Sequence, residues 1–450
     1  MVLPLLVCCA DVDSDARDPM LQRPPPAMEQ DQPVAPMRID TSEASPPIAP
    51  MASLSTAQEI TRGDVSIQIG GGAAVLATNA QGEIFLADVS VSKLDADLRP
   101  VWQVHTGGRV FALVALADGG ALAGGEYQDG CVVAAGWVCA RGFITRLGPN
   151  GDKLWTLRFD HPRFASRVTG LAENDGVFYV AGQFDGELHL GREQVASAEG
   201  RVDFFVLALS PDATRAIWAH TLGSAVDDGD GPVLSANPVG GVIAAGHVQD
   251  APAGFIRAYT ATGETRFETV VRGRVSLFQL VVDGRGHIWA SGGMRDTIEL
   301  GDEQTPRRFV AQSEFDALVL ELDPSGAVRS VLQLSSPTDG GVTSVALAPR
   351  PAGVWFINAY GYHGLYVDTK RVVTRIAVID GRGSYRELDV FEMWCTGSRQ
   401  AASGTIDGAL LWTSHAARPT TFGLEEGTFP ANNFLMRRTF SPAGDADDGS

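Results

Sequence analysis

The 450-residue chain lacks long hydrophobic runs and has a deficit of positive charge. No apolar stretch approaches the roughly 20 residues that a helix needs to cross a bilayer, so we expect no transmembrane helix. The 35 basic residues face 54 acidic ones, which gives a formal net charge of −19 and disfavours general binding to nucleic acid or anionic lipid. With 44% hydrophobic and 20% charged residues, the chain is not mostly disordered, collagen-like or a coiled coil.

Sequence signatures of catalysis are also absent. The eight histidines are scattered and form no His-x-x-x-His pair of the kind that holds a metal. The chain contains no Gly-x-Ser-x-Gly nucleophile turn, no phosphate-binding loop and no dinucleotide fingerprint. We therefore expect no catalytic residue and no resident cofactor.

The first sixty residues differ in composition from the rest. Residues 1–10 form an apolar run that ends in Cys8, Cys9 and Ala10, and an acidic stretch follows. This resembles a bacterial lipoprotein signal, and the resemblance implies acylation at Cys9 in preference to Cys8 and an exported protein at the outer membrane or cell surface, otherwise periplasmic or secreted. The alternative is an uncleaved apolar N-terminus of a cytosolic protein.

Two segments have the composition of disordered chain. Residues 11–58 contain nine of the 25 prolines and almost no aromatic residues, so they cannot bury enough apolar area to offset their ordering entropy. We interpret them as a proline-rich tether. Residues 441–450 form an acidic tail that we also expect to be disordered.

Residues 59–440 contain an internal repeat of β-type segments. A block beginning Gly182-Gln-Phe-Asp-Gly has a counterpart beginning at Gly292, and each precedes a strand-like segment that starts at Asp203 or Asp316. A turn glycine followed by an apolar strand recurs at Gly82, Gly120, Gly176, Gly241, Gly286, Gly353 and Gly408. Aromatic residues mark the start of a later, outer strand at Trp102, Trp155, Trp218 and Phe267.

Seven copies with four strands each predict an all-β fold, a seven-bladed β-propeller of four-stranded blades. The pattern resembles the SBBP-type and related repeat propellers of bacterial secreted and surface proteins. The seventh copy lacks its outer strand, and residues 64–70 have the alternation of one. We expect this N-terminal strand to complete the last blade and close the ring, which removes two exposed sheet edges.

The connections between second and third strands are long, at 128–141, 185–202, 295–315, 361–372 and 416–432, whereas turns on the opposite face are tight. Long loops on one side of a rigid scaffold indicate a binding face, the alternative being loops that bind nothing. Within the first loop, Cys131 and Cys139 have the spacing of a disulfide in an exported protein, and we expect Cys395 to be a buried thiol.

Calcium is the one metal for which the sequence contains candidate ligands. Asp227, Asp228 and Asp230 lie in an acidic glycine-rich turn, but no glutamate follows at the distance that an EF-hand loop requires. A solvated acidic turn is therefore the favoured interpretation. We interpret Trp289, Trp355 and Trp412 as core residues between blades.

The sequence favours a monomeric, non-enzymatic propeller that binds an envelope protein or glycan through its long-loop face, with membrane attachment only through a lipid anchor. Two alternatives stay open. One is a propeller enzyme, such as a quinoprotein-like dehydrogenase or a hydrolase. The other is a purely structural spacer.

Overall fold

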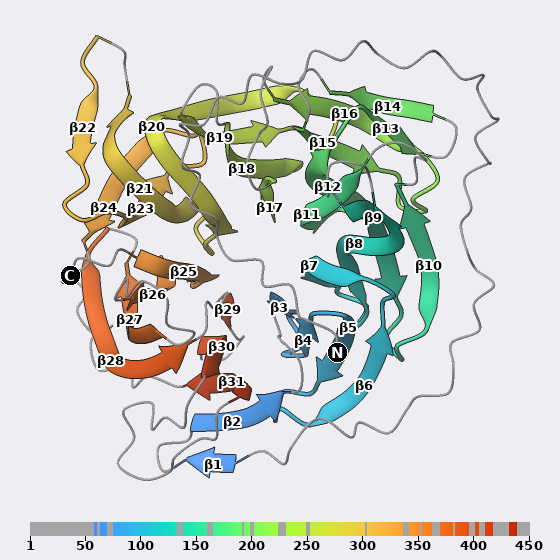
Figure 1. Cartoon of the computed structure of the whole chain (residues 1–450), viewed down its shortest axis with the longest axis horizontal. Coiled ribbons are helices and arrows are strands. Elements are labelled where there is room, and N and C mark those ends of the chain that lie inside the picture. The colour runs from blue at the N-terminus through green and yellow to red at the C-terminus, as the bar shows by residue number, and fades with distance from the viewer. Residues whose placement is uncertain are drawn as a thin grey trace.

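The computed structural model in Figure 1 consists of β-strands and turns wherever the chain is described. Its described residues are 58–60, 64–69, 75–132, 138–159, 165–190, 193–198, 202–223, 231–248, 253–301, 304–335, 342–351, 353–361, 370–380, 383–395, 401–404, 410–416 and 432–438. Over these ranges the protein is all-β, and no helix is long and apolar enough to cross a membrane.

Most strands form four-stranded antiparallel sheets in chain order. The first sheet contains β3 (Val75–Thr78), β4 (Ile84–Ala87), β5 (Ser90–Leu94) and β6 (Pro100–His105). The second contains β7 (Arg109–Ala115), β8 (Ala121–Val132), β9 (Val138–Leu147) and β10 (Lys153–Arg158). The third contains β11 (Ser166–Asn174), β12 (Val177–Phe184), β15 (Asp203–Leu209) and β16 (Ala216–Leu222), and β13 (Glu187–Leu190) pairs with β14 (Glu193–Ser197) beside it. A later sheet contains β25 (Val342–Pro349), β26 (Val354–Gly361), β27 (Lys370–Ile379) and β28 (Tyr385–Cys395).

Between them lies a larger sheet that one long strand holds together. It contains β17 (Val233–Ala236), β18 (Val242–Val248), β19 (Ala253–Tyr259), β20 (Thr265–Val282), β21 (Ile288–Leu300), β23 (Asp316–Leu322) and β24 (Val328–Leu334), with β22 (Arg307–Val310) beside β21. The first half of β20 pairs with β19 and the second half with β21. Gly273 lies where the partner changes, at φ 107°, and a Cβ there would overlap the Thr297 carbonyl oxygen. Glycine thus allows one strand to serve as the fourth strand of one group and the first of the next.

The last sheet joins the two ends of the described chain. It contains β29 (Ala401–Gly404), β30 (Leu410–Ala416), β31 (Asn432–Arg438), β2 (Asp64–Ile69) and β1 (Gln58–Ile60). The N-terminal β2 pairs antiparallel with the C-terminal β31, with Ile67 opposite Leu435. The sequence did not predict β1, which makes this sheet five-stranded by pairing with β2. Figure 1 shows the sheets placed around a common centre, as in a propeller.

The burial of each strand follows its place in the sheet. The third strands β15 and β23 are buried at every position, because they have a strand on each side and a sheet on each face. The outer strand β6 has exposed residues at three of its six positions. Continuous apolar segments such as 204–209 are therefore third strands, and mixed segments are outer strands.

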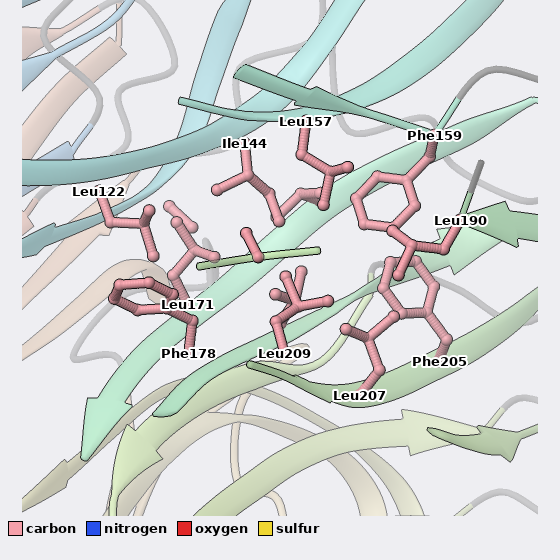
Figure 2. Packing of buried hydrophobic residues seen from close by; sticks show 14 of the residues in the cluster. Leu122, Ile144, Leu157, Phe159, Leu171, Phe178, Leu190, Phe205, Leu207 and Leu209 are labelled. Carbon is pink, nitrogen blue, oxygen red and sulfur yellow. The ribbon is translucent and has the colours of Figure 1, made fainter. Parts of the chain in front are cut away.

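The hydrophobic core lies between neighbouring sheets. In Figure 2, Leu122 and Ile144 of the second sheet face Leu171, Phe178 and Leu209 of the third, all in one buried cluster. The same arrangement joins the first and last sheets, where Leu411 and Leu435 share a buried cluster with residues of the first, Leu76, Ile84, Leu86, Leu94 and Leu98. Trp289 is buried in another such cluster and Trp355 is also buried, in line with the sequence prediction, whereas the Trp412 side chain lies outside the description.

The aromatic residues of the outer strands hold each sheet to the next. Trp102 Nε1 donates a hydrogen bond to the Pro149 carbonyl at 2.8 Å, and its ring lies against Gly151. Trp218 makes the same contact between the third sheet and the next one. Its Nε1 donates to the Ala261 carbonyl at 3.0 Å, and its ring covers Gly263. Each turn glycine has a positive φ, so the pairing of aromatic ring and glycine turn is a recurrent contact between sheets.

Three of the long connections contain paired strands and are not irregular loops. Residues 128–141 are largely the extended ends of β8 and β9. The range 185–202 includes the β13–β14 hairpin, and 295–315 includes the end of β21 paired with β22. Most of 361–372 and of 416–432 lies outside the described residues. The expected loops are thus in large part β-hairpins, which hold side chains in defined positions.

Candidate functional site

The two faces of the molecule differ in their connections. In an antiparallel sheet ordered along the chain, the connections between first and second and between third and fourth strands lie at one end. Here those turns are tight, as at Asn79–Gly82 and Asp323–Gly326, where backbone hydrogen bonds close the turn. The connections between second and third strands lie at the other end and carry the hairpins described above. We call that end the hairpin face.

The first strand of several groups has a β-bulge near the hairpin face. Phe111 lies between the paired residues Val110 and Ala112 and has no residue opposite, and Thr169 and Phe278 hold the same place in β11 and β20. The facing residue on the second strand is glycine. A Cβ on Gly125 or Gly182 would overlap the carbonyl oxygen of Arg109 or Arg167 respectively. Gly182 and Gly292 recur in the sequence because this close approach requires them.

Two of these bulged residues contact the beginning of the next first strand. Thr169 Oγ1 donates to the Pro232 carbonyl at 2.8 Å. Phe111 instead forms a cation–π contact with Arg167, and the guanidinium carbon lies 5.0 Å from the ring centroid. Arg109, from the same strand as Phe111, lies 5.3 Å from that centroid. Two guanidinium groups from neighbouring sheets therefore contact one phenyl ring.

Two carboxylates accompany these arginines. Arg167 Nε donates to Glu126 Oε2 at 2.5 Å, and Glu126 is buried. Arg109 Nε lies 3.8 Å from Asp88 Oδ1, a distance too long for a hydrogen bond. We call Asp88, Arg109, Phe111, Glu126 and Arg167 the arginine–phenylalanine cluster. The cluster contains two positive and two negative groups and lies at the hairpin face.

The predicted disulfide lies on the strands that flank this cluster. Cys131 follows Glu126 along β8, and Cys139 lies on β9. The two cysteines directly adjoin Val132 and Val138, which are paired across the hairpin. The strands thus bring the two backbones close, while both side chains lie outside the description, and the disulfide stays a prediction. Cys395 ends β28, and its side chain is likewise not described.

The repeated aspartates that begin third strands are structural. Asp316 is fully buried and accepts hydrogen bonds from Ser335 Oγ at 2.8 Å, Gln333 Nε2 at 2.6 Å and the Gln312 amide at 2.9 Å. Burial by itself raises the pKa of Asp316, but the hydrogen bonds from Ser313, Gln312, Gln333 and Ser335 together lower it. The carboxylate therefore ties the loop before β23 to the end of β24. Asp203 holds the corresponding position in β15 and is also fully buried.

A second group of arginines lies on the hairpin of β20, β21 and β22. Glu299 lies opposite Arg272 on one side and Arg308 on the other, and Arg308 Nε is 2.8 Å from Glu299 Oε1. Arg274 is 3.5 Å from Asp296. The opposite side of this hairpin is apolar, with Ile298 buried against Phe309 in the core. The hairpin thus has one face in the core and one polar face in solvent.

The remaining sequence predictions fall outside the described residues. Cys8 and Cys9, the tether up to residue 57 and the tail 441–450 are among these, as are Asp227, Asp228 and Asp230. Among the residues that the structure does describe, no group of three or more histidine, cysteine, aspartate or glutamate side chains is placed to hold a metal ion. Sequence reasoning missed the arginine–phenylalanine cluster, although Arg-Val begins the first strand at Arg109, Arg167 and Arg274.

Comparison with known proteins gives neighbours in structure alone. No family model matches the chain. No curated protein matches it either. Selenomethionine-substituted virginiamycin B lyase from Staphylococcus aureus aligns over 86% of this chain and 100% of its own, at 8% identity and a TM-score of 0.43. The polysaccharide lyase Uly1 aligns over 82% and 90%, at 8% identity and a TM-score of 0.41. A DUF4221 family member from Bacteroides vulgatus aligns over 68% and 92%, at 7% identity and a TM-score of 0.34. These neighbours are β-propeller-like proteins, and together they indicate no one activity.

Proposed function

We propose that the chain is a seven-bladed β-propeller closed by an N-terminal strand. When each half of β20 is assigned to its own group, the first strands are β3, β7, β11, β17, the second half of β20, β25 and β29. The pairing of β2 with β31 and the burial of Leu411 and Leu435 beside the first sheet support closure. Closure would leave neither the first nor the last sheet with an uncovered face.

We further propose that the propeller is a non-enzymatic scaffold that binds a protein or glycan through its hairpin face. The observation that carries this proposal is the asymmetry of the two faces. Tight turns close one face, whereas β8–β9, β13–β14 and β21–β22 extend the other. These hairpins expose side chains such as Val310, which is 59% exposed. Binding residues are commonly held this way, on connections that a rigid scaffold positions.

We propose that the protein is located at the cell envelope. In this proposal an acyl group on Cys9, or else on Cys8, anchors the chain, and residues 11–58 form the tether between anchor and propeller. The negative charge keeps the propeller soluble near anionic lipid without adhering to it. The bound partner is then another envelope protein or a surface glycan, and the protein acts as a monomer.

Two matched variants test the binding face. Val310 in β22 and Val239 in a tight turn are exposed to nearly the same extent, 59% and 57%, and lie on opposite faces. Full-length protein carrying Val310→Asp or Val239→Asp is immobilised and incubated with envelope extract from the source cells. We expect Val310→Asp to reduce capture of the partner severalfold and Val239→Asp to leave it unchanged. Equal capture by both variants, or no specific capture by the wild type, would contradict the proposal and favour a structural spacer.

A further inference from the structure

The arginine–phenylalanine cluster presents two guanidinium groups at the hairpin face. Arg109 has 48% of its side chain exposed and Arg167 has 32%. The described hydrogen bond of Arg167 uses Nε, and Arg109 has no acceptor within hydrogen-bond distance among the described residues. Within the part of the chain that the structure describes, the terminal Nη groups of both side chains form no hydrogen bond.

Contacts within the protein restrict the positions of both guanidinium groups, that of Arg167 more than that of Arg109. Phe111 contacts both groups, which lie 5.3 and 5.0 Å from its ring centroid. Buried Glu126 holds Arg167 through Nε, which orients the planar group. The bulge that places Phe111 depends on Gly125, which no larger residue can replace. Such preorganisation reduces the entropy that binding would otherwise cost.

We propose that this cluster binds the carboxylate of a uronic-acid-bearing saccharide, an inference that rests on the proposed binding function and names its ligand class. A guanidinium presents a planar fork of donors that matches the two oxygens of a carboxylate. Both guanidinium groups contact the same phenyl ring, so each can direct its terminal N–H donors to a carboxylate at this part of the hairpin face. A neutral sugar offers no group of that charge.

The carboxylates of the cluster favour a saccharide over an acidic peptide. Asp88 and Glu126 lie beside the two arginines and accept hydrogen bonds, so they suit a ligand that carries hydroxyl donors next to its carboxylate. A uronic acid has both groups on one ring. A run of glutamate residues carries carboxylates but no hydroxyl groups that could donate to Asp88 or Glu126. The mixed charge of the site therefore selects for the sugar acid.

The test is calorimetric titration of the full-length protein with tri-galacturonate. The uncharged trisaccharide of the same linkage and a poly-glutamate peptide serve as the other two ligands. We expect the wild type to bind tri-galacturonate and neither of the others. Arg109→Ala should weaken that binding by about tenfold or more, since it removes a hydrogen bond to a charged group. Arg109→Lys should recover only part, because it keeps the charge without the fork.

The control is Arg99→Ala, which removes an exposed arginine from the tight-turn face, where it is 3.3 Å from Asp97. It should bind tri-galacturonate as the wild type does. The inference is overturned if the wild type does not bind tri-galacturonate, if Arg109→Ala binds it equally well, or if poly-glutamate binds as tightly. Envelope capture that still depends on Val310 would then show that the hairpin face binds a partner of another kind. Loss of both results would overturn the proposed function as well.

Discussion

Lys93 in β5 forms an ion pair with Glu83 and also links the first two sheets. Its Nζ lies 2.7 Å from Glu83 Oε1 in its own sheet and donates to the Gly119 carbonyl of the next sheet at 2.8 Å. The side chain is buried, and it is one of only three lysines in the chain. A buried ammonium group is tolerated only where its hydrogen bonds are made, so this contact is a fixed link between the first two sheets.

Lys93→Met should destabilise the fold by about 2 kcal/mol, because Glu83 Oε1 loses its cation and the Gly119 carbonyl loses its donor. The double variant Lys93→Met, Glu83→Gln should lose less unfolding free energy than the two single variants lose together, since it leaves no charge unpaired. Urea unfolding of the four proteins measures this coupling. Strictly additive effects would mean that the ion pair contributes nothing.

Alanine variants of Gly151 and Gly176 distinguish the energetic effect of backbone strain from that of packing between sheets. Both have positive φ values, 85° and 79°, but a Cβ on Gly151 would lie 3.0 Å from Trp102 Cδ2, whereas a Cβ on Gly176 meets nothing within 4 Å. Alanine should cost about 1 kcal/mol at either position through φ alone. Gly151→Ala should cost about 1–2 kcal/mol more, because Trp102 must move. Equal melting temperatures would show that the ring does not hold the turn.

Asp316 makes the stability of the fold depend on pH in the acidic range. Its pKa is lowered in the folded protein, so its contribution to stability is present above the unfolded value of about 3.9 and is lost as pH falls through the folded value. Asp316→Asn should be less stable than the wild type by about 2 kcal/mol at neutral pH. The new side-chain NH2 group would face the Gln312 amide, Gln333 and Ser335, which are themselves donors. The difference should shrink below about pH 4. Free energies of unfolding at a series of pH values measure it, and a constant difference would contradict the assignment.

The sequence predicted the strands better than the site. The copies at Gly182 and Gly292 were recognisable because a bulge imposes the same glycine each time, and the third strands because burial on both faces makes them apolar. The hairpins were missed as strands, since short segments such as 187–190 bury only alternate residues beside a turn glycine. β1 was missed because three residues carry too little periodicity.

The arginine–phenylalanine cluster could not be found from spacing along the chain. Arg167 reaches Phe111 only because β11 lies beside β7 in the next sheet. The bulge that turns Phe111 out of the strand pairing depends on which residue faces Gly125, and one sequence does not disclose that register. The Arg-Val pairs at Arg109, Arg167 and Arg274 were a usable signal, since they repeat at the same place in three first strands.

The loop cysteines provide a chemical test of the β8–β9 hairpin. Peptide mapping of protein unfolded without reductant should link Cys131 to Cys139 and find Cys395 free to alkylate. Cys131→Ser should remove that disulfide and no other. A peptide that joins Cys395 to either loop cysteine would contradict the assignment.

Strand β2 provides the test of ring closure. It pairs with β31 from Val65 to Ile69, so it covers the edge of the last sheet. A variant lacking residues 1–57 should remain folded with an unchanged melting temperature, because it keeps both β1 and β2. A variant lacking residues 1–72 should melt lower and aggregate, since β31 would then expose its hydrogen-bonding edge. A third variant lacking residues 1–62 removes β1 alone and should resemble the first in melting temperature, because β1 pairs with β2 over only three residues. Thermal unfolding and light scattering of the three proteins decide the matter: if all three melt and scatter alike, β2 does not close the ring.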